Sequence, residues 1–305
     1  MGRTESLVQH ESFFTRMRRL LKGGYTFKEV KDRWSAIHYP ILSKSAVTSY
    51  ELSFSYAKEF WNWPITKLKY KHYQAVINDM HNKGLTYSSQ KKFKNLVGQC
   101  LDFAIKNEWA EFNYAPMLQL DRHIPVHNKV PFSEMEIRRL WHYYNRYSGV
   151  DIVLMLIYTG VRVGEFLRID MKKDCFLDDR YFIVRESKTE AGRNRMVPIH
   201  RDILPFFKAR RKYQYAATDR KGHYFSNYNS FHKMFREVME KMNMNHTIHE
   251  TRHTCATLLD SAGANDMATK KILGHAGTGI TKQVYIHKYL TDLLQAIDLV
   301  KGRDI

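Results

Sequence analysis

Cysteine and long apolar runs are scarce in this chain of 305 residues. The cysteines, Cys100, Cys175 and Cys255, are far apart and form no CxxC pair, which argues against a disulfide framework and for reduced thiols in a cytosolic compartment. No stretch of about 18 apolar residues occurs, so we expect no membrane span. Charged and polar residues interrupt the first segment, MGRTESLVQHESFF, which therefore does not resemble a signal peptide.

Acidic residues are also fewer than basic residues. The chain holds 49 Lys and Arg against 31 Asp and Glu, a formal net charge of +18. Such an excess attracts polyanions and speeds the encounter with them. Nucleic acid is therefore the leading partner, and an acidic membrane surface is the second. Both halves of the chain carry a share of the excess, which predicts that both face the same polyanion. A soluble protein that is basic for no functional reason is the alternative.

The N-terminal part of the chain has helical periodicity throughout. Apolar residues recur at helical spacing, and Gly, Pro and capping residues separate the runs. Helices are predicted at residues 1–24, 26–38, 45–61, 69–82 and 88–106. Residues 25–115 are therefore expected to form an all-helical domain, with residues 1–24 as an amphipathic helix or a linker before it.

A proline-rich segment separates this domain from a second one of mixed character. Residues 116–131 contain three prolines and lack periodicity, so a linker is predicted there. Ser133 and Glu136 form a capping box that starts a helix. Residues 176–199 alternate in polarity and contain turn residues, which indicates a small antiparallel sheet of three strands. The predicted fold class is therefore mainly α with a small antiparallel β-sheet. The other predicted helices of this domain are 149–159, 162–169, 203–214, 229–242 and 250–262.

Two lysine clusters lie at or near predicted helix starts in the first domain. Helix N-termini already favour phosphate, so basic side chains there are good candidates for contacts with a nucleic-acid backbone. A solvated helix face is the structural alternative. The predicted DNA contacts in these clusters are Lys67, Lys69, Lys71, Lys91, Lys92 and Lys94.

The segment HETRH, residues 249–253, has the spacing of a zinc-peptidase motif. Its two histidines, one helical turn apart, would bind zinc, and Glu250 would polarise water. Arg252, however, would place a permanent cation beside the metal, and Asp266 and His275 are the sole plausible third ligands downstream. The basic excess also has no role in a peptidase. We therefore expect no metal at this segment.

The same segment is also suited to binding phosphate. Arg252 and Arg162 both lie near predicted helix starts. Two guanidiniums can hold a phosphodiester through bidentate hydrogen bonds and stabilise a pentacovalent transition state. Lys188 lies in a strand–turn segment, from which its flexible stem can reach into a groove and protonate a leaving oxygen. Taken singly, these residues also fit a surface salt bridge or a hairpin turn.

Two histidines and a tyrosine complete this set. His249 and His275 can donate to phosphate oxygens or take a proton. Tyr285 supplies a nucleophilic oxygen once nearby cations or a base favour its phenolate form. A helix cap for His275 and a core aromatic for Tyr285 are the structural alternatives. The appearance of all these residues in one order favours phosphoryl-transfer chemistry.

Three sequence boxes closely resemble the tyrosine recombinase, or phage integrase, family over roughly residues 130–290. The first, MLIYTGVRVGEFLRI, is similar to the family's TG-x-R-x-x-E-x-x-x-L stretch. The second, SKTEAGRNRMVPI, is similar to K-T followed by R-x-V-P. The third, HETRHTCATLLDSAGANDMATKKILGHAGTGITKQVYIH, is similar to H-x-x-R-H-T-x-A-T-x-L-x-x-x-G followed by L-G-H and Y-x-H. Arg193 and Arg195 of the second box are predicted DNA contacts, and Glu165 is implied to support the first catalytic arginine. The catalytic residues that the resemblance implies are Arg162, Lys188, His249, Arg252, His275 and Tyr285.

The resemblance implies two domains that close around duplex DNA as a clamp. An α+β catalytic domain would span residues 132–290 and a helical core-binding domain residues 25–115. The stretches WPITKL and SSQKKFKNLVGQCLDFAIKNEW are similar to parts of that helical domain. Many relatives end it with Asn-Pro, whereas this chain has Asn113-Tyr114-Ala115-Pro116. Residues 1–24 are too short for the arm-binding domain that some integrases carry.

The resemblance also implies a mechanism that needs neither a metal nor another cofactor. Tyr285 attacks a scissile phosphate, leaving a 3′-phosphotyrosyl link and a free 5′-hydroxyl. The arginines stabilise the transition state, Lys188 acts as general acid, His249 assists removal of the tyrosine proton and His275 bonds the phosphate. A homotetramer on two specific DNA sites exchanges strands through a Holliday junction and integrates or excises a mobile element. We expect a cytoplasmic, prokaryotic or phage protein, with an accessory DNA-bending or directionality factor as a further partner. A type IB-like topoisomerase and a non-enzymatic DNA-binding protein are the alternatives.

The last predicted helix, residues 291–305, has one apolar face. Leu293, Leu294, Ile297 and Val300 share that face. It is predicted either to dock into a neighbouring protomer, as an exchange helix, or to pack on its own domain.

Overall fold

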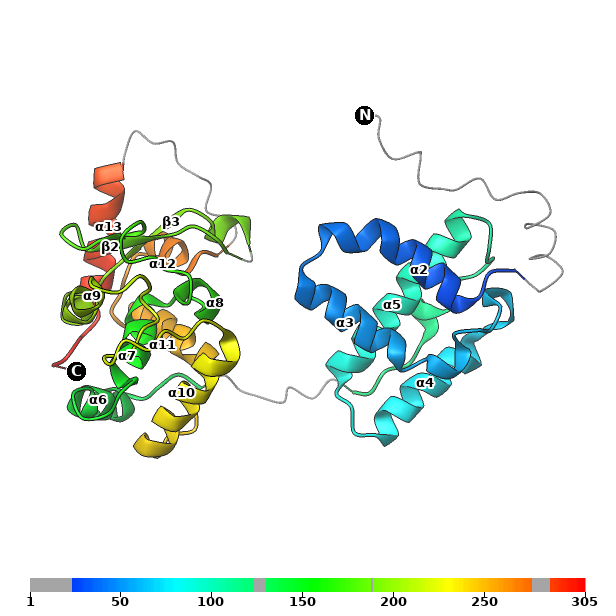
Figure 1. Cartoon of the computed structure of the whole chain (residues 1–305), viewed down its shortest axis with the longest axis horizontal. Coiled ribbons are helices and arrows are strands. Elements are labelled where there is room, and N and C mark those ends of the chain that lie inside the picture. The colour runs from blue at the N-terminus through cyan, green and yellow to red at the C-terminus, as the bar shows by residue number, and fades with distance from the viewer. Residues whose placement is uncertain (1–23, 123–129, 188, 276–285, 305) are drawn as a thin grey trace. The chain divides into compact units, whose positions relative to one another are not determined.

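The computed structural model describes residues 24–122, 130–187, 189–275 and 286–304, and the chain divides into two compact units, Met1–Val126 and His127–Ile305 (Figure 1). The described residues are mainly helical and contain one three-stranded antiparallel sheet. The fold class predicted from the sequence is thereby confirmed. None of the helices in the described ranges is both long and apolar enough to cross a membrane.

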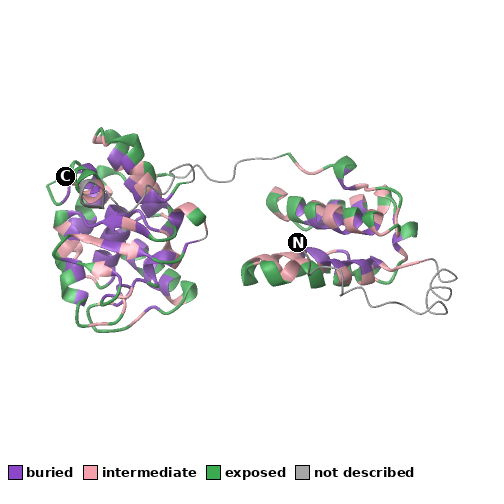
Figure 2. Cartoon of the chain, turned by 90° about the horizontal axis from the view of Figure 1, so that it is seen from above, coloured by how far each residue is buried: buried purple, intermediate pink, exposed green. Residues whose placement is uncertain are grey.

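The first unit is a helical domain built around its longest helix, α5. This helix packs against α2, α3 and α4, and the buried residues lie along the facing sides of the helices (Figure 2). Thr26, Ser43 and Thr86 cap three of the helices by accepting a backbone N–H, which satisfies donors that the first helical turn leaves unpaired. The bounds are α2 Phe27–His38, α3 Lys44–Ser55, α4 Tyr70–Asn82 and α5 Tyr87–Lys106.

Three of the helices predicted in this unit are confirmed, and the prediction for a fourth extends past the observed end of the helix. The predicted helix at residues 45–61 ends instead at Ser55, and a 3₁₀ turn, Lys58–Phe60, follows it. The Trp61 indole folds back and donates to the carbonyl oxygen of Phe54 at 3.0 Å, so it closes the chain onto α3 instead of extending it. Of the predicted helix at residues 1–24, residues 1–23 lie outside the described residues.

After α5 the chain remains packed on the first unit past residue 116, where the predicted linker begins. The backbone N–H of Gln119 donates to Gln74 Oε1 at 2.9 Å, and that of Asp121 donates to Gln90 Oε1 at 3.0 Å. A 3₁₀ turn, Ala115–Met117, and the buried Leu118 also belong to this packing. The linker predicted at 116–131 is therefore wrong over residues 116–121, because polar side chains on α4 and α5 hold this backbone.

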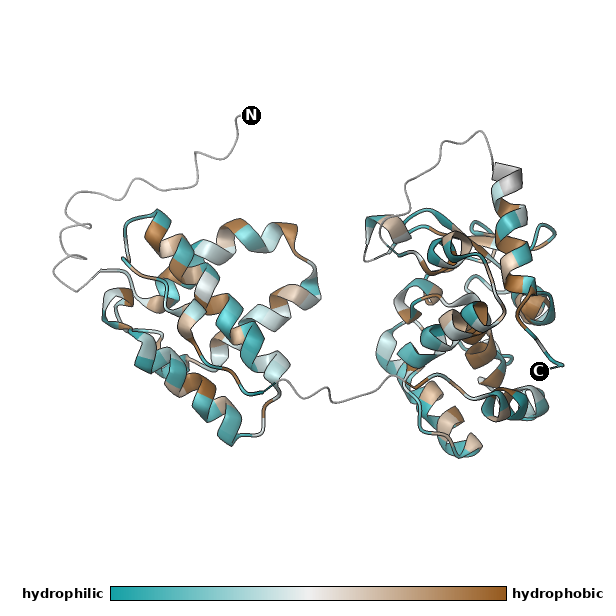
Figure 3. Ribbon diagram, turned by 180° about the vertical axis from the view of Figure 1, so that it is seen from behind, coloured by the Kyte–Doolittle hydropathy of each residue, from teal (hydrophilic) through white to brown (hydrophobic). Residues whose placement is uncertain are grey.

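The second unit combines helices with the small sheet. Its strands pair in the order β1-β2-β3, and Phe182 of β2 lies opposite Val197 of β3, both fully buried. Brown, apolar segments of helix and strand lie on the inside of the unit in Figure 3. The strands are β1 Cys175–Phe176, β2 Tyr181–Val184 and β3 Arg195–Pro198. The helices are α6 Glu134–Tyr143, α7 Val150–Thr159, α8 Val163–Phe166, α9 Leu204–Arg210, α10 Tyr228–Met242, α11 Ile248–Ser261, α12 Asp266–Leu273 and α13 Ile286–Asp298.

Helix α7 forms the centre of this unit, as its almost wholly apolar sequence predicts. All of its residues are buried, and it packs against α6 and α11. Asp151 is its one acidic residue, and the Arg210 guanidinium donates to that carboxylate at 2.7 Å. Such a pair offsets the cost of burying the charge. The predicted capping box of Ser133 and Glu136 is present at the start of α6.

The last helix, α13, packs on its own unit. Leu293, Ile297 and Val300 are at most 4% exposed, and α13 contacts β3 and α12. The chain that follows is also held there, because Tyr158 Oη donates to the Lys301 carbonyl at 3.0 Å. Three of the four residues of the predicted apolar face therefore pack within the chain, and Leu294 is half-buried. The helix also begins at Ile286, five residues before the predicted segment 291–305.

Candidate active site

The candidate site is organised around Glu165, a buried carboxylate in the single turn of helix that forms α8. Arg162 precedes α8, and its backbone N–H donates to Glu165 Oε2 at 2.9 Å, which starts the helix. The Arg162 guanidinium donates to Glu165 Oε1, also at 2.9 Å. Glu165 therefore fixes both the backbone and the side chain of Arg162, whose side chain keeps 27% of its surface exposed.

Two residues of the β2–β3 segment bind the same carboxylate. Ser187 donates its hydroxyl to Glu165 Oε1 at 2.6 Å. Arg195, on β3, donates Nη2 to Oε2 at 2.7 Å and Nη1 to Oε1 at 3.2 Å. Burial works to raise the pKa of Glu165, but the hydrogen bonds and charge of Arg195, with Ser187 and the Arg162 backbone, outweigh it and lower the pKa to about 2.

Arg195 itself is not placed to contact DNA, contrary to the sequence prediction. It is 5% exposed, and besides Glu165 its guanidinium donates to the carbonyl oxygens of Gly192 at 2.8 Å and Ile272 at 3.1 Å. The strand pattern contained a signal for this burial, because Arg195 alternates with Val197 and therefore shares its inward face. Arg195 joins the sheet, α8 and the end of α12.

Arg252, on α11, binds the carboxyl ends of two other helices. Its Nη1 donates to the Gly160 carbonyl at the end of α7 at 2.8 Å, and its Nη2 donates to the Leu273 carbonyl at the end of α12. Helix C-termini favour cations, so both contacts suit a guanidinium. Burial, followed by the charges of Arg162 and Arg195, lowers the pKa of Arg252 to about 10. The arginine still remains protonated at neutral pH.

A left-handed glycine makes this convergence sterically feasible. Gly160 ends α7 with φ of 62°, and a Cβ there would lie 2.7 Å from Leu273 Cδ2 and 2.8 Å from Cys255 Sγ. No other residue type fits both the backbone angle and the space. Gly160 therefore lets α7, α11 and α12 meet two residues before Arg162.

Of the two catalytic histidines predicted from the sequence, His249 lies on α11 and His275 lies just after α12. His249 is exposed in the first turn of α11, with its ring perpendicular to that of His253 at 4.9 Å between centroids. His275 follows Gly274, where a Cβ would lie 3.0 Å from Arg195 Cδ. Burial lowers the pKa of His275, and so do the positive charges of Arg252, Arg162 and Arg195. His275 therefore lies in the field of all three arginines.

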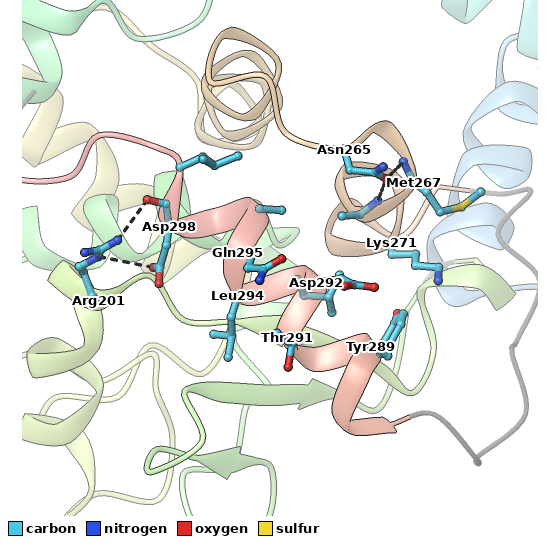
Figure 4. Close-up of a pocket in the computed structure, with 14 residues that line it drawn as sticks. Arg201, Asn265, Met267, Lys271, Tyr289, Thr291, Asp292, Leu294, Gln295 and Asp298 are labelled. Carbon is cyan, nitrogen blue, oxygen red and sulfur yellow. Dashed lines mark hydrogen bonds and ion pairs between the residues drawn. The ribbon is translucent and has the colours of Figure 1, made fainter.

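Lys188 and Tyr285 lie outside the described residues, although the chain on both sides of Lys188 and directly after Tyr285 is described. Ser187, directly before Lys188, is bound to Glu165. Ile286, directly after Tyr285, begins α13. That helix is held near its start by Lys271, whose Nζ lies 4.4 Å from the Tyr289 ring centroid, and near its end by Asp298, which pairs with Arg201 (Figure 4).

The glutamate of the HETRH segment is used for structure. Glu250 is the third residue of α11 and accepts the Thr247 backbone N–H at 2.7 Å in a capping box. Its carboxylate also faces the His246 ring. No group of three His, Cys, Asp or Glu side chains suited to a metal occurs within the described ranges. The zinc interpretation thus receives no support from the arrangement of these side chains.

The predicted DNA contacts of the first unit differ in their surroundings. Lys94 is partly buried, and its Nζ donates to the Pro116 carbonyl at 3.2 Å and to the Leu118 carbonyl at 2.8 Å. We therefore assign Lys94 to the packing of the chain after α5 and withdraw it as a DNA contact. Arg193 of the second unit is exposed beside Glu190. The remaining lysines of the two clusters are all exposed: Lys67, Lys69, Lys71, Lys91 and Lys92.

Comparisons with known proteins identify the family and the fold. The tyrosine recombinase XerA of Saccharolobus solfataricus is 28% identical over 160 residues, which cover 52% of this chain and 53% of that protein. This chain spans about half the length of several curated relatives that it matches. The Tn1549 transposon integrase in complex with a circular intermediate DNA has a TM-score of 0.71 at 20% identity and covers 83% of this chain and 92% of that one.

A second structural neighbour covers nearly the whole chain. The lambda integrase tetramer bound to a Holliday junction has a TM-score of 0.70 at 15% identity, with 91% of this chain and 85% of that one covered. Likeness at this level of identity establishes a shared fold. The model of the phage integrase family matches residues 132–291, which is more than half of the chain and includes Arg162, Arg252 and His275. The chain therefore belongs to the phage integrase family.

Proposed function

We propose that the protein is a site-specific DNA recombinase of the tyrosine class, which integrates or excises a mobile element. The observation that carries this proposal is the convergence of Arg162, Arg252 and His275 around the Glu165 network. Two guanidiniums, of which that of Arg162 keeps exposed surface, suit a phosphodiester, because guanidiniums bind phosphate oxygens in pairs. Membership of the phage integrase family points to the same chemistry.

In the proposed cleavage step, the Tyr285 oxygen attacks a scissile phosphorus of duplex DNA. A bond from that oxygen to phosphorus forms, and the bond from phosphorus to the 5′ oxygen breaks. The products are a 3′-phosphotyrosyl link and a 5′-hydroxyl. One phosphodiester replaces another, so the step needs no external energy source. Attack of a 5′-hydroxyl on the phosphotyrosine reverses the chemistry and rejoins the strand.

The arginines have a clear electrostatic role in this step. Negative charge builds on the phosphate oxygens in the pentacovalent transition state, and fixed donors that need no rearrangement stabilise such charge strongly. Glu165 holds the Arg162 guanidinium, and two helix ends hold that of Arg252, so both are positioned before DNA binds. Arg162 retains the exposed surface required to meet a phosphate.

The remaining residues would transfer protons or donate hydrogen bonds during cleavage. We assign Lys188 as the general acid that protonates the leaving 5′ oxygen, because Ser187 anchors the adjacent backbone to the site. His249 would assist removal of the tyrosine proton. His275, whose pKa is lowered, would be neutral at physiological pH and donate one N–H to the phosphate.

Recombination also requires assembly on DNA. We propose that the two units close around duplex DNA, which the net charge of +18 would attract. We further propose that four protomers act on two specific sites through a Holliday junction, by analogy with the lambda integrase tetramer bound to a Holliday junction. Such a protein would act in the cytoplasm, where an accessory DNA-bending or directionality factor is a further proposed partner.

A nicked duplex tests this function. If the duplex carries a nick just 3′ to the scissile phosphate, cleavage releases a short 5′-hydroxyl fragment and traps the covalent adduct. The wild-type protein should form that adduct on its cognate site, and Tyr285→Phe should bind the same duplex without forming it. An undiminished adduct with Tyr285→Phe contradicts the proposal. Relaxation of plasmids lacking any specific site, without recombinant product, would indicate a topoisomerase instead.

A further inference from the structure

His246 lies between two carboxylates in the segment that joins α10 to α11. Its side chain is 5% exposed. The ring Nε2 is 3.0 Å from Glu136 Oε1, and Nδ1 is 3.2 Å from Glu250 Oε2. The ring also stacks on Phe132, with centroids 3.8 Å apart and planes at 20°. One imidazole therefore joins α6, α11 and the segment that precedes α6.

Both ring nitrogens of His246 face carboxylate oxygens. A neutral ring has one N–H and one lone pair, so it would turn the lone pair toward one of the carboxylates. The imidazolium donates from both nitrogens, and charge-assisted bonds of this kind are the stronger ones. The groups that face the ring are Glu136 from α6, Glu250 from α11 and the uncharged Phe132. The nearby Arg139 of α6 is directed elsewhere, since it donates to the Met242 carbonyl at 2.8 Å.

Both carboxylates also start helices. Glu136 closes the capping box of Ser133 in α6, and Glu250 closes that of Thr247 in α11. Burial works to raise the pKa of each glutamate, but bonds from its capping residue and from His246 outweigh burial and lower it. The two helix starts are therefore coupled through His246.

The same cluster holds the segment through which the chain enters the second unit. The Phe132 backbone N–H donates to Thr254 Oγ1 on α11 at 2.9 Å. The Val130 backbone bonds to Glu250. Residues 130–132 are thus tied to the first two turns of α11, the helix that carries His249 and Arg252.

We propose that His246 is a positioning residue, whose buried ring between Glu136 and Glu250 fixes the start of α11, and with it His249 and Arg252, against the entry segment. It touches neither DNA nor the reacting atoms. The inference rests on the proposed function, because the step that it affects is strand cleavage. DNA binding, which depends on charge spread over both units, should not require it.

The test compares His246→Gln with the wild type in the full chain, using the rate of adduct formation on the nicked duplex. Gln donates from one end only, so one carboxylate loses its partner. The variant should be about tenfold slower, in line with the loss of one hydrogen bond to a charged group. Duplex affinity should not change.

Two further variants separate this role from a general effect on packing. Glu136→Gln keeps a capping-box side chain, since Gln serves there as well as Glu, but removes the charge. It should slow cleavage in the same direction, and the double variant should be no slower than His246→Gln alone. The matched control is His142→Gln, an exposed histidine on α6, which should match the wild type.

Two results would overturn the inference. An unchanged rate of adduct formation with His246→Gln, or additive effects of His246→Gln and Glu136→Gln, would show that the two residues do not act through a shared contact. If the wild type binds duplex but forms no adduct, the proposed function fails. The melting temperatures then decide the inference, because His246→Gln should melt below the wild type and the double variant should melt no lower than His246→Gln.

Discussion

Arg195 and Glu165 form an ion pair inside the second unit, with Nη2 2.7 Å from Oε2 and side chains 4% and 2% exposed. The same carboxylate accepts from Arg162 and from Ser187, the neighbour of Lys188. Arg162, Ser187 and β3, which carries Arg195, therefore all depend on the charge of one glutamate.

Replacing Glu165 with Gln should destabilise the protein in a pH-dependent way. The folded state lowers the pKa of this carboxyl from its ordinary 4.5 to about 2. A carboxyl whose pKa is lower in the folded protein stabilises the fold fully at pH values above its pKa in the unfolded chain. This stabilisation is lost as the pH falls through the pKa of the folded protein. The wild type should therefore exceed Glu165→Gln by about 3 kcal/mol in free energy of unfolding near neutral pH, and the difference should vanish toward pH 2.

Denaturant titrations at several pH values measure this difference. Glu186→Gln is the matched control, because Glu186 is 75% exposed and its ion pair with Arg168, at 3.5 Å, lies on the surface. It should change the free energy of unfolding by less than about 0.5 kcal/mol. A Glu165→Gln curve that runs parallel to wild type down to pH 2 would contradict the assigned ion pair.

Replacing Gly160 with Ala should be more harmful than the same change at Gly263. Both glycines have positive φ, 62° and 69°, but a Cβ at Gly263 meets nothing within 4 Å, whereas at Gly160 it overlaps Leu273 and Cys255. Gly263→Ala should lower the free energy of unfolding by about 1 kcal/mol through backbone strain alone. Gly160→Ala should lower it by about 3 kcal/mol, because steric overlap adds to the strain. Thermal unfolding compares them, and equal losses would mean that the tight packing of α7 against α11 is wrong.

Arg252→Lys should impair cleavage while leaving DNA binding nearly intact. A lysine keeps the charge but has one nitrogen, which cannot reach both the Gly160 and Leu273 carbonyls that the guanidinium bridges. The rate of adduct formation should fall about a hundredfold, as expected for loss of one preorganised donor. Arg236→Lys, at an exposed position on α10, is the control. A change in duplex affinity equal to the change in rate would argue against a role in the transition state.

The salt dependence of DNA binding should distinguish Lys91 and Lys92 from Lys94. The first two are exposed at the start of α5, whereas Lys94 is bonded to two carbonyl oxygens. Removing one lysine that binds a phosphate should reduce the slope of log affinity against log salt by about 1. Lys91→Gln and Lys92→Gln should show this, and Lys94→Gln should lower stability with an unchanged slope. The opposite pattern would restore Lys94 as a DNA-binding residue.

Local sequence signals predicted most of the fold. Capping residues such as Thr26 and Ser133 and the apolar run of α7 indicated where helices begin and which one is buried. These local signals failed where contacts between distant parts of the chain determine where a helix or a linker ends. Nothing local to residues 45–61 indicates that the Trp61 indole would bond to Phe54 and end α3 early. Likewise, the side chains that hold residues 119–121 come from α4 and α5, about thirty or more positions away.

The site was predictable as a list of residues more than as an arrangement. The order of Arg162, Lys188, Arg252 and the two histidines is visible in the boxes, and the structure brings Arg162, Arg252 and His275 together. The role of Arg195 was not visible, since one of several arginines in a basic segment gives no sign of its partner. Only the pairing of β2 with β3 and the position of α8 show that it binds Glu165.

The identity of the residue linked to DNA tests the central claim most directly. Adduct trapped on a nicked cognate duplex can be digested with protease and nuclease, and the nucleotide-bearing peptide sequenced by mass spectrometry. We predict a single peptide, modified at Tyr285 through the 3′-phosphate. Linkage to any other residue, or cleaved DNA without a covalent peptide, would contradict the assignment of Tyr285 as the nucleophile.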